Sequence, residues 1–182
     1  MDTWRPTDFD LVIFDCDGVL IDSEIISLSM LIAELAERGV QVDLDYVSRN
    51  FLGRSYPTVM QTIRDQFGLD LPPEFEDHYR ARLLAAFQTD LQVMPGIRGA
   101  IDGLALPRCV ATSSSPARAE MSLRHVGLAD LVGPRLFTAS MVARGKPAPD
   151  LFLHAAQACG ADPARCLVIE DSLTGIRAGL AA

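Results

Sequence analysis

The strongest constraint on the fold of this chain is a set of four short apolar runs, each about as long as a β-strand. They lie at 10–15, 108–112, 135–138 and 166–169. Segments with the apolar spacing of helices lie near 97–104, 116–126, 150–159 and from 173 to the end. Alternating strands and helices predict a parallel sheet with helices on both faces. The expected fold class is therefore α/β with a Rossmann-like parallel sheet.

A long helical stretch interrupts this alternation after the first strand. Helical spacing begins after Asp22 and Ser23, which can cap a helix. Further helices are expected at 43–52, 55–67 and 74–88. No strand candidate occurs among them. We therefore expect an all-helical domain at 22–92, inserted into an α/β core formed by 1–21 and 93–182.

Composition excludes several classes of partner. The chain has 182 residues, of which 49% are hydrophobic and 22% charged, enough apolar material for a core without disulfides. Its net charge of -8 argues against nucleic acid or an anionic membrane as a partner. The four cysteines form no CxxC pair and are expected to be reduced thiols. We expect a cytoplasmic protein, monomeric or weakly homo-oligomeric, that binds neither nucleic acid nor membrane.

Acidic residues follow the first and last of the predicted strands. Asp15 and Asp17 follow the first strand, and Glu170 with Asp171 follow the last. The carboxyl ends of parallel strands meet at one edge of a sheet, so these four acids can share a pocket. Their repulsion would raise some of their pKa values, and a divalent cation would relieve it. Oxygen ligands favour Mg²⁺ over zinc, and Mg²⁺ is commonly shared with a phosphate. The pattern predicts Mg²⁺ and a phosphorylated substrate.

Two further segments at predicted strand ends suit a phosphate. Lys146 is the only lysine among the sixteen basic residues, and it lies in GKPAPD directly before a helix. An ammonium group is a compact point charge, unlike the wide, planar guanidinium of arginine. Thr112, Ser113 and Ser114 join a strand to a helix, where hydroxyl and backbone N–H groups can surround a phosphate.

Four motifs together resemble those of the haloacid dehalogenase superfamily of phosphotransferases. They are DCDGVLIDSE (15–24), VATSS (110–114), GKPAPD (145–150) and VIEDS (168–172). The resemblance covers essentially the whole chain. It is nearest to the beta-phosphoglucomutase and phosphoglycolate phosphatase-like subfamily, and within that to bacterial sugar-phosphate or phosphogluconate phosphatases. It implies a Mg²⁺-dependent phosphomonoester hydrolase acting on a small, sugar-phosphate-like metabolite.

The resemblance also implies roles for individual residues. Asp15 resembles the nucleophile that becomes an aspartyl-phosphate, and Asp17 resembles the general acid and base. Thr112, Ser113, Ser114 and Lys146 would bind phosphoryl oxygens. The implied metal ligands are Asp15, Asp17 through its backbone carbonyl, Glu170 and Asp171. The insertion resembles a small mobile cap, in which Gly53 and Arg54 belong to the substrate-facing turn, although a solvated surface arginine is the alternative for Arg54.

Other functions remain open on the sequence. A sugar-phosphate mutase would carry His at Ser27 and Arg at Tyr56. A receiver-like phospho-acceptor module would lack the helical insertion and would have a different order of acids. An inactive, truncated relative is a third alternative, because the family continues through a further strand and helix. We expect those two elements to be missing, as in a fragment, in a processed form, or in a protein that tolerates their loss.

Overall fold

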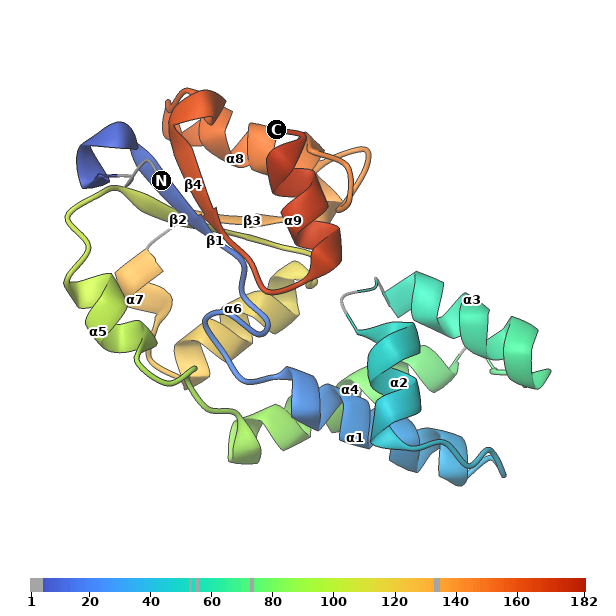
Figure 1. Cartoon of the computed structure of the whole chain (residues 1–182). Coiled ribbons are helices and arrows are strands. Elements are labelled where there is room, and N and C mark those ends of the chain that lie inside the picture. Colours follow the sequence, from blue (N-terminus) through green and yellow to red (C-terminus); the bar gives the residue numbers. More distant parts are fainter. Residues whose placement is uncertain (1–4, 53, 55, 73, 133–134) are drawn as a thin grey trace. The chain divides into compact units, whose positions relative to one another are not determined.

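The computed structural model describes residues 5–52, 54, 56–72, 74–132 and 135–182. Within it the chain forms two compact units. The first consists of Met1–Asp22 and Gln92–Ala182, and the second of Ser23–Leu91. Each unit has buried hydrophobic residues of its own. Figure 1 labels the helices and strands of both units.

A parallel sheet forms the centre of the first unit. Among the described residues its strands are β1 (Leu11–Phe14), β2 (Arg108–Thr112), β3 (Leu136–Thr138) and β4 (Cys166–Ile169), in the order β3-β2-β1-β4. All three pairings are parallel. The chain therefore adds β2 and β3 on one side of β1 and returns to place β4 on the other. This reversal puts a topological switch point between β1 and β4, where open α/β sheets bind ligands.

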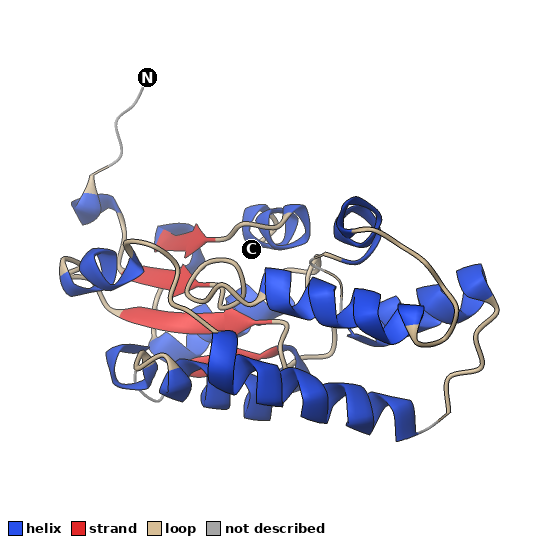
Figure 2. Cartoon of the chain, turned by 90° about the horizontal axis from the view of Figure 1, so that it is seen from below, coloured by secondary structure: helices blue, strands red, loops and turns tan. Residues whose placement is uncertain are grey.

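Helices cover both faces of this sheet (Figures 1 and 2). The helices of the first unit are α5 (Ile97–Asp102), α6 (Pro116–His125), α7 (Ala129–Val132), α8 (Asp150–Cys159) and α9 (Leu173–Leu180). Short 3₁₀ turns lie at Pro6–Asp8 (η1), Ala139–Met141 (η2) and Pro163–Arg165 (η3). Leu11 and Ile13, on one face of β1, pack with Leu151 and Phe152 of α8 in a buried apolar cluster. The two-residue alternation of a strand leaves Val12 and Phe14, also buried, for the opposite face.

The second unit consists of α1 (Glu24–Ala36), α2 (Leu44–Phe51), α3 (Tyr56–Phe67) and α4 (Glu74–Asp90). Its core includes Leu31 and Leu35 of α1. The buried carboxylate of Glu34 is paired with Arg38 at 2.9 Å and with Arg82. Burying this charge is tolerable because two guanidinium groups neutralise it.

The predicted elements agree closely with these bounds. The α/β class with an all-helical insertion is confirmed, and the strands at 108–112 and 166–169 and the helix at 150–159 have the predicted limits. The capping prediction for the first helix was only partly right. Ser23 occupies the N-cap position of α1, but its side chain makes no cap hydrogen bond. None of the helices in the described ranges is long and apolar enough to cross a membrane.

Candidate active site

Backbone pairing at the switch point brings two of the predicted acids together. The backbone N–H of Asp15 donates to the carbonyl of Ile169 at 2.9 Å, which extends the β1–β4 pairing to the carboxyl ends of both strands. Asp15 directly follows β1 and Glu170 directly follows β4. The two side chains therefore leave neighbouring strands at the same edge of the sheet, as expected for parallel strands in register.

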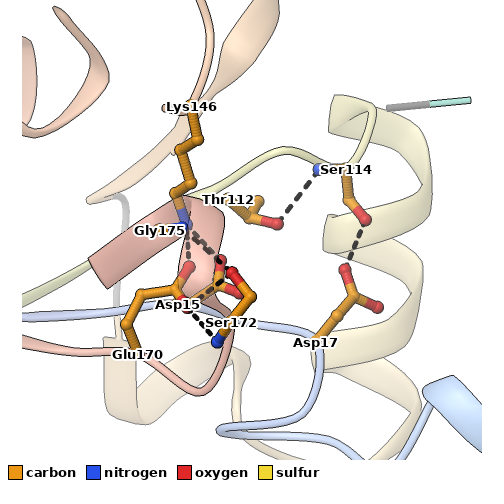
Figure 3. A network of polar contacts seen from close by, with 8 residues as sticks. All are labelled: Asp15, Asp17, Thr112, Ser114, Lys146, Glu170, Ser172 and Gly175. Carbon is orange, nitrogen blue, oxygen red and sulfur yellow. Dashed lines mark hydrogen bonds and ion pairs between the residues drawn. The ribbon is translucent and has the colours of Figure 1, made fainter. Parts of the chain in front are cut away.

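Lys146 joins these two acids. Its Nζ atom donates to Asp15 Oδ1 at 2.8 Å and to Glu170 Oε1 at 2.8 Å (Figure 3). Lys146 lies in the loop between η2 and α8, and its side chain is only 3% exposed. Its Nζ also lies 4.9 Å from the ring centroid of Phe152, within the range of a cation–π contact. A buried ammonium with two carboxylate partners is fixed as a point charge at this edge.

The surroundings of Asp15 disfavour its ionised form. Burial, as the largest cause, raises the pKa of Asp15 to about 7. The Lys146 ammonium acts in the opposite direction, whereas the carboxylates of Glu170 and Asp17 raise this pKa further. The lowering effect of Lys146 on this pKa is therefore smaller than the raising effect of burial and the two carboxylates together, and positive charge from a ligand would favour the ionised form of Asp15.

Glu170 is held in position by the start of α9. Its Oε2 atom accepts from the backbone N–H of Ser172 at 2.7 Å and from the Ser172 hydroxyl at 3.0 Å. The same hydroxyl accepts from the N–H of Gly175 at 3.0 Å, as a helix cap. A Cβ atom at Gly175 would lie 1.7 Å from Glu170 Oε1, so the carboxylate fits only against a glycine. Sequence reasoning missed Ser172 and Gly175, although a serine before a helix is a capping signal.

A second glycine makes room for Asp171. Gly18 has a φ of +76° and donates its N–H to the carbonyl of Ile21 at 2.9 Å, in the turn after β1. A Cβ atom there would lie 2.2 Å from Asp171 Oδ2. This position requires glycine both for its left-handed backbone and for the close approach of the carboxylate.

The side chain of Asp17 has its own contacts, separate from the group around Lys146. Its Oδ2 atom accepts from the Ser114 hydroxyl at 2.5 Å, and its Oδ1 atom accepts from Arg118 Nη2 at 2.7 Å. Figure 3 shows Asp17 directed toward Ser114, apart from the group around Lys146. Sequence reasoning did not single out Arg118, the third residue of α6.

The predicted phosphate-binding segment lies at the end of β2. Thr112 is buried, and its Oγ1 atom accepts from the Ser114 backbone N–H at 3.1 Å. Ser113 is exposed. The Ser114 hydroxyl contacts Asp17, so a contact of Ser113 or Ser114 with phosphate stays a prediction.

Three of the acids form a candidate site for a divalent cation. One carboxylate oxygen from each of Asp15, Glu170 and Asp171 lies within 4.8 Å of the others. Such a set of hard oxygen donors fits Mg²⁺. Contacts to Lys146 and Ser172 already engage both oxygens of Glu170. The backbone carbonyl of Asp17 as a ligand stays a prediction.

The predicted substrate-facing turn belongs to the second unit. Arg54 is exposed there. Gly53 lies outside the described residues. A substrate contact for either residue stays a prediction.

Comparison with known proteins gives the family. A family model for haloacid dehalogenase-like hydrolases matches residues 9–182. A 6-phosphogluconate phosphatase from Escherichia coli is 27% identical over 94% of this chain and 78% of its own length. A fructose-1-phosphate phosphatase from the same organism is 32% identical, covering 94% of this chain and 91% of its own. The chain also matches longer relatives, of which it spans 46% and 17%.

A solved structure supports the same relationship. A hydrolase of this family from Deinococcus radiodurans, with bound phosphate and sodium, is 38% identical, with a TM-score of 0.77 over 96% of this chain and 77% of its own. Because the family model spans nearly the whole chain and relatives with phosphatase names match most of it, the protein belongs to the haloacid dehalogenase-like hydrolases and is an enzyme of the phosphatase type.

Proposed function

We propose that this protein is a Mg²⁺-dependent phosphomonoester hydrolase that acts on a small phosphorylated sugar or sugar acid through an aspartyl-phosphate at Asp15. The observation that carries the proposal is the contact of Lys146 with Asp15 and Glu170 at the switch point of the sheet. It places a fixed cation beside a buried carboxylate. That arrangement suits a phosphoryl group, whose transfer depends mainly on positioning and on neutralised charge.

The proposed reaction has two steps. An Asp15 carboxylate oxygen attacks phosphorus, and the bond from phosphorus to the leaving oxygen breaks while Asp17 gives that oxygen a proton. A water then transfers a proton to Asp17 and attacks the phosphorus, which releases inorganic phosphate and restores the Asp15 carboxylate. Lys146 and Thr112 would hold phosphoryl oxygens through both steps.

Asp15 and Asp171 are the proposed ligands of Mg²⁺, with Glu170 beside them. Bound Mg²⁺ would neutralise charge on the phosphoryl oxygens. The raised pKa of Asp15 supports this assignment, because burial and the neighbouring carboxylates disfavour its charge and a bound cation would relieve that cost.

The substrate class rests on the relatives. Those named above act, by their names, on 6-phosphogluconate and on fructose 1-phosphate, which are small phosphorylated sugar derivatives. The helical unit Ser23–Leu91 would serve as the cap that encloses such a substrate, as its insertion directly after the first strand suggests.

The test is phosphate release from a panel of sugar phosphates and sugar-acid phosphates, with Mg²⁺ and with EDTA. The wild type should release phosphate only with Mg²⁺, and Asp15→Asn should lower turnover by roughly a thousandfold or more. Asp102→Asn, at an exposed position in α5, is the matched control and should leave turnover unchanged. Undiminished turnover in Asp15→Asn would refute the nucleophile assignment.

A further inference from the structure

Arg118 is a residue of the site to which neither the motifs nor the mechanism above assign a role. It donates from Nη2 to Asp17 Oδ1 at 2.7 Å, while the Ser114 hydroxyl donates to Oδ2 of the same carboxylate. Both side chains of the ion pair are partly buried, with 26% of Arg118 and 23% of Asp17 exposed. We propose that Arg118 is a positioning residue that orients the Asp17 carboxylate for proton transfer; this inference rests on the proposed function.

Two donors from one segment determine the plane of this carboxylate. Ser114 lies in the loop that follows β2, and Arg118 lies in the first turn of α6. The end of β2 therefore positions both donors. The backbone N–H of Ser114 is itself fixed by Thr112 Oγ1 at 3.1 Å. With only the Ser114 contact, the carboxylate could rotate about its Cβ–Cγ bond. The second contact, from a planar guanidinium, restricts that rotation.

This contact differs from an ordinary surface ion pair. The same helix carries Arg124, which pairs with Glu120 at 3.9 Å in an exposed i,i+4 arrangement. Such exposed pairs contribute little. Arg118 instead reaches across 101 positions of sequence to the residue proposed as general acid and base. Arg124 therefore offers a matched control on the same helix.

A positioning role predicts a specific kinetic pattern. The constant kcat/KM covers the steps from free enzyme and substrate up to departure of the leaving group, which forms the aspartyl-phosphate. A good leaving group such as p-nitrophenolate needs little protonation, whereas phenolate needs more. A poorly oriented Asp17 should therefore slow phosphoryl transfer from phenyl phosphate more than from p-nitrophenyl phosphate. Hydrolysis of the aspartyl-phosphate is common to both substrates, so kcat should fall for both.

The experiment measures kcat and kcat/KM with Mg²⁺ for these two aryl phosphates. Relative to wild type, Arg118→Ala should lower the phenyl to p-nitrophenyl ratio of kcat/KM by about tenfold or more. Arg118→Lys should recover part of the ratio, because it restores a charged donor. Arg124→Ala should leave both constants unchanged. Thermal melting verifies folding, and Arg118→Gln replaces the alanine variant in the same test if alanine prevents folding.

Three results would overturn the inference. An equal fall in kcat/KM for the two substrates would mean a structural role, because a smaller folded fraction lowers both values by the same factor. A rise in KM with an unchanged kcat would mean that Arg118 only binds substrate. Wild-type kinetics in the folded variant would mean no role at all. A wild type that releases phosphate neither from these two substrates nor from the sugar-phosphate panel would instead refute the proposed function, and the inference with it.

Discussion

Removing the charge of Asp15 should stabilise the metal-free protein above neutral pH while it abolishes turnover. In the folded state burial raises the pKa of this carboxyl from 3.8 to about 7. A carboxyl with a raised pKa favours folding below its unfolded pKa, and this advantage is lost as the pH rises through the folded pKa. At pH 8 Asp15 must therefore be ionised in a site that disfavours its charge. Asp15→Asn keeps nearly the same shape without that charge.

The magnitude follows from the pKa difference. Each pKa unit corresponds to about 1.4 kcal/mol, so ionising Asp15 in the folded protein costs at most about 4 kcal/mol at pH 8. Asparagine must place its own amide N–H groups near Lys146, which offsets part of this gain. We expect Asp15→Asn to raise the free energy of unfolding by about 1–3 kcal/mol at pH 8. The gain should fall toward zero near pH 4.

The assay is urea unfolding of the wild type and of Asp15→Asn in EDTA at pH 4, 5, 6, 7 and 8. The difference between their free energies of unfolding is compared across pH, because the effects of other titrating groups cancel in it. Added Mg²⁺ should stabilise the wild type more than the variant, since the variant lacks one proposed ligand. Asp102→Asn should show no pH-dependent difference from wild type. A variant less stable than wild type at pH 8, or a difference independent of pH, would refute the electrostatic reasoning.

The remaining predictions concern the glycines beside the acids. Gly175→Ala should lower kcat by at least about tenfold, because its Cβ would overlap the Glu170 carboxylate; steady-state assays with p-nitrophenyl phosphate would measure this. Unchanged kcat would show that Glu170 can move without loss. Gly18→Ala should raise the Mg²⁺ concentration needed for half-maximal activity about tenfold, because it displaces Asp171. Gly39→Ala is its control, since Gly39 also has positive φ, at +80°, but nothing lies within 4 Å of the added Cβ. Equal Mg²⁺ requirements in these two variants would contradict the prediction.

The convergence of Asp15, Lys146 and Glu170 could be predicted because it depends on topology. Short apolar runs that alternate with helices require parallel strands, and parallel strands place the residues after them at one edge. The structure brings these three side chains to that edge with 2.8 Å contacts. Topology alone accounts for Asp15 and Glu170, which directly follow β1 and β4, whereas the position of Lys146 also depends on the loop between η2 and α8.

The role of Arg118 could not be predicted, because it depends on side-chain direction. Fifteen arginines in the sequence give no signal for the one whose guanidinium reaches Asp17. Its place in the first turn of α6 is visible in the sequence, but the direction of the turn after β1 is not. The same holds for the contact of the Ser114 hydroxyl with Asp17, while a phosphate contact of Ser114 stays a prediction.

Gly18 and Gly175 connect the fold to the chemistry. Each lies so close to a carboxylate that a single added carbon would overlap it. Close packing against the backbone at these glycines therefore helps to bring the acids together, in addition to the contacts of Lys146 with Asp15 and Glu170. Burial is the main cause of the raised pKa of Asp15, and repulsion by the carboxylates of Glu170 and Asp17 raises this pKa further. Without a bound cation, this unfavourable charge destabilises the carboxyl ends of β1 and β4. Binding of Mg²⁺ should therefore stabilise the edge between these two strands more than any other part of the sheet. Hydrogen exchange with and without Mg²⁺ should therefore show the largest added protection at the Asp15 amide, whose N–H bonds to Ile169.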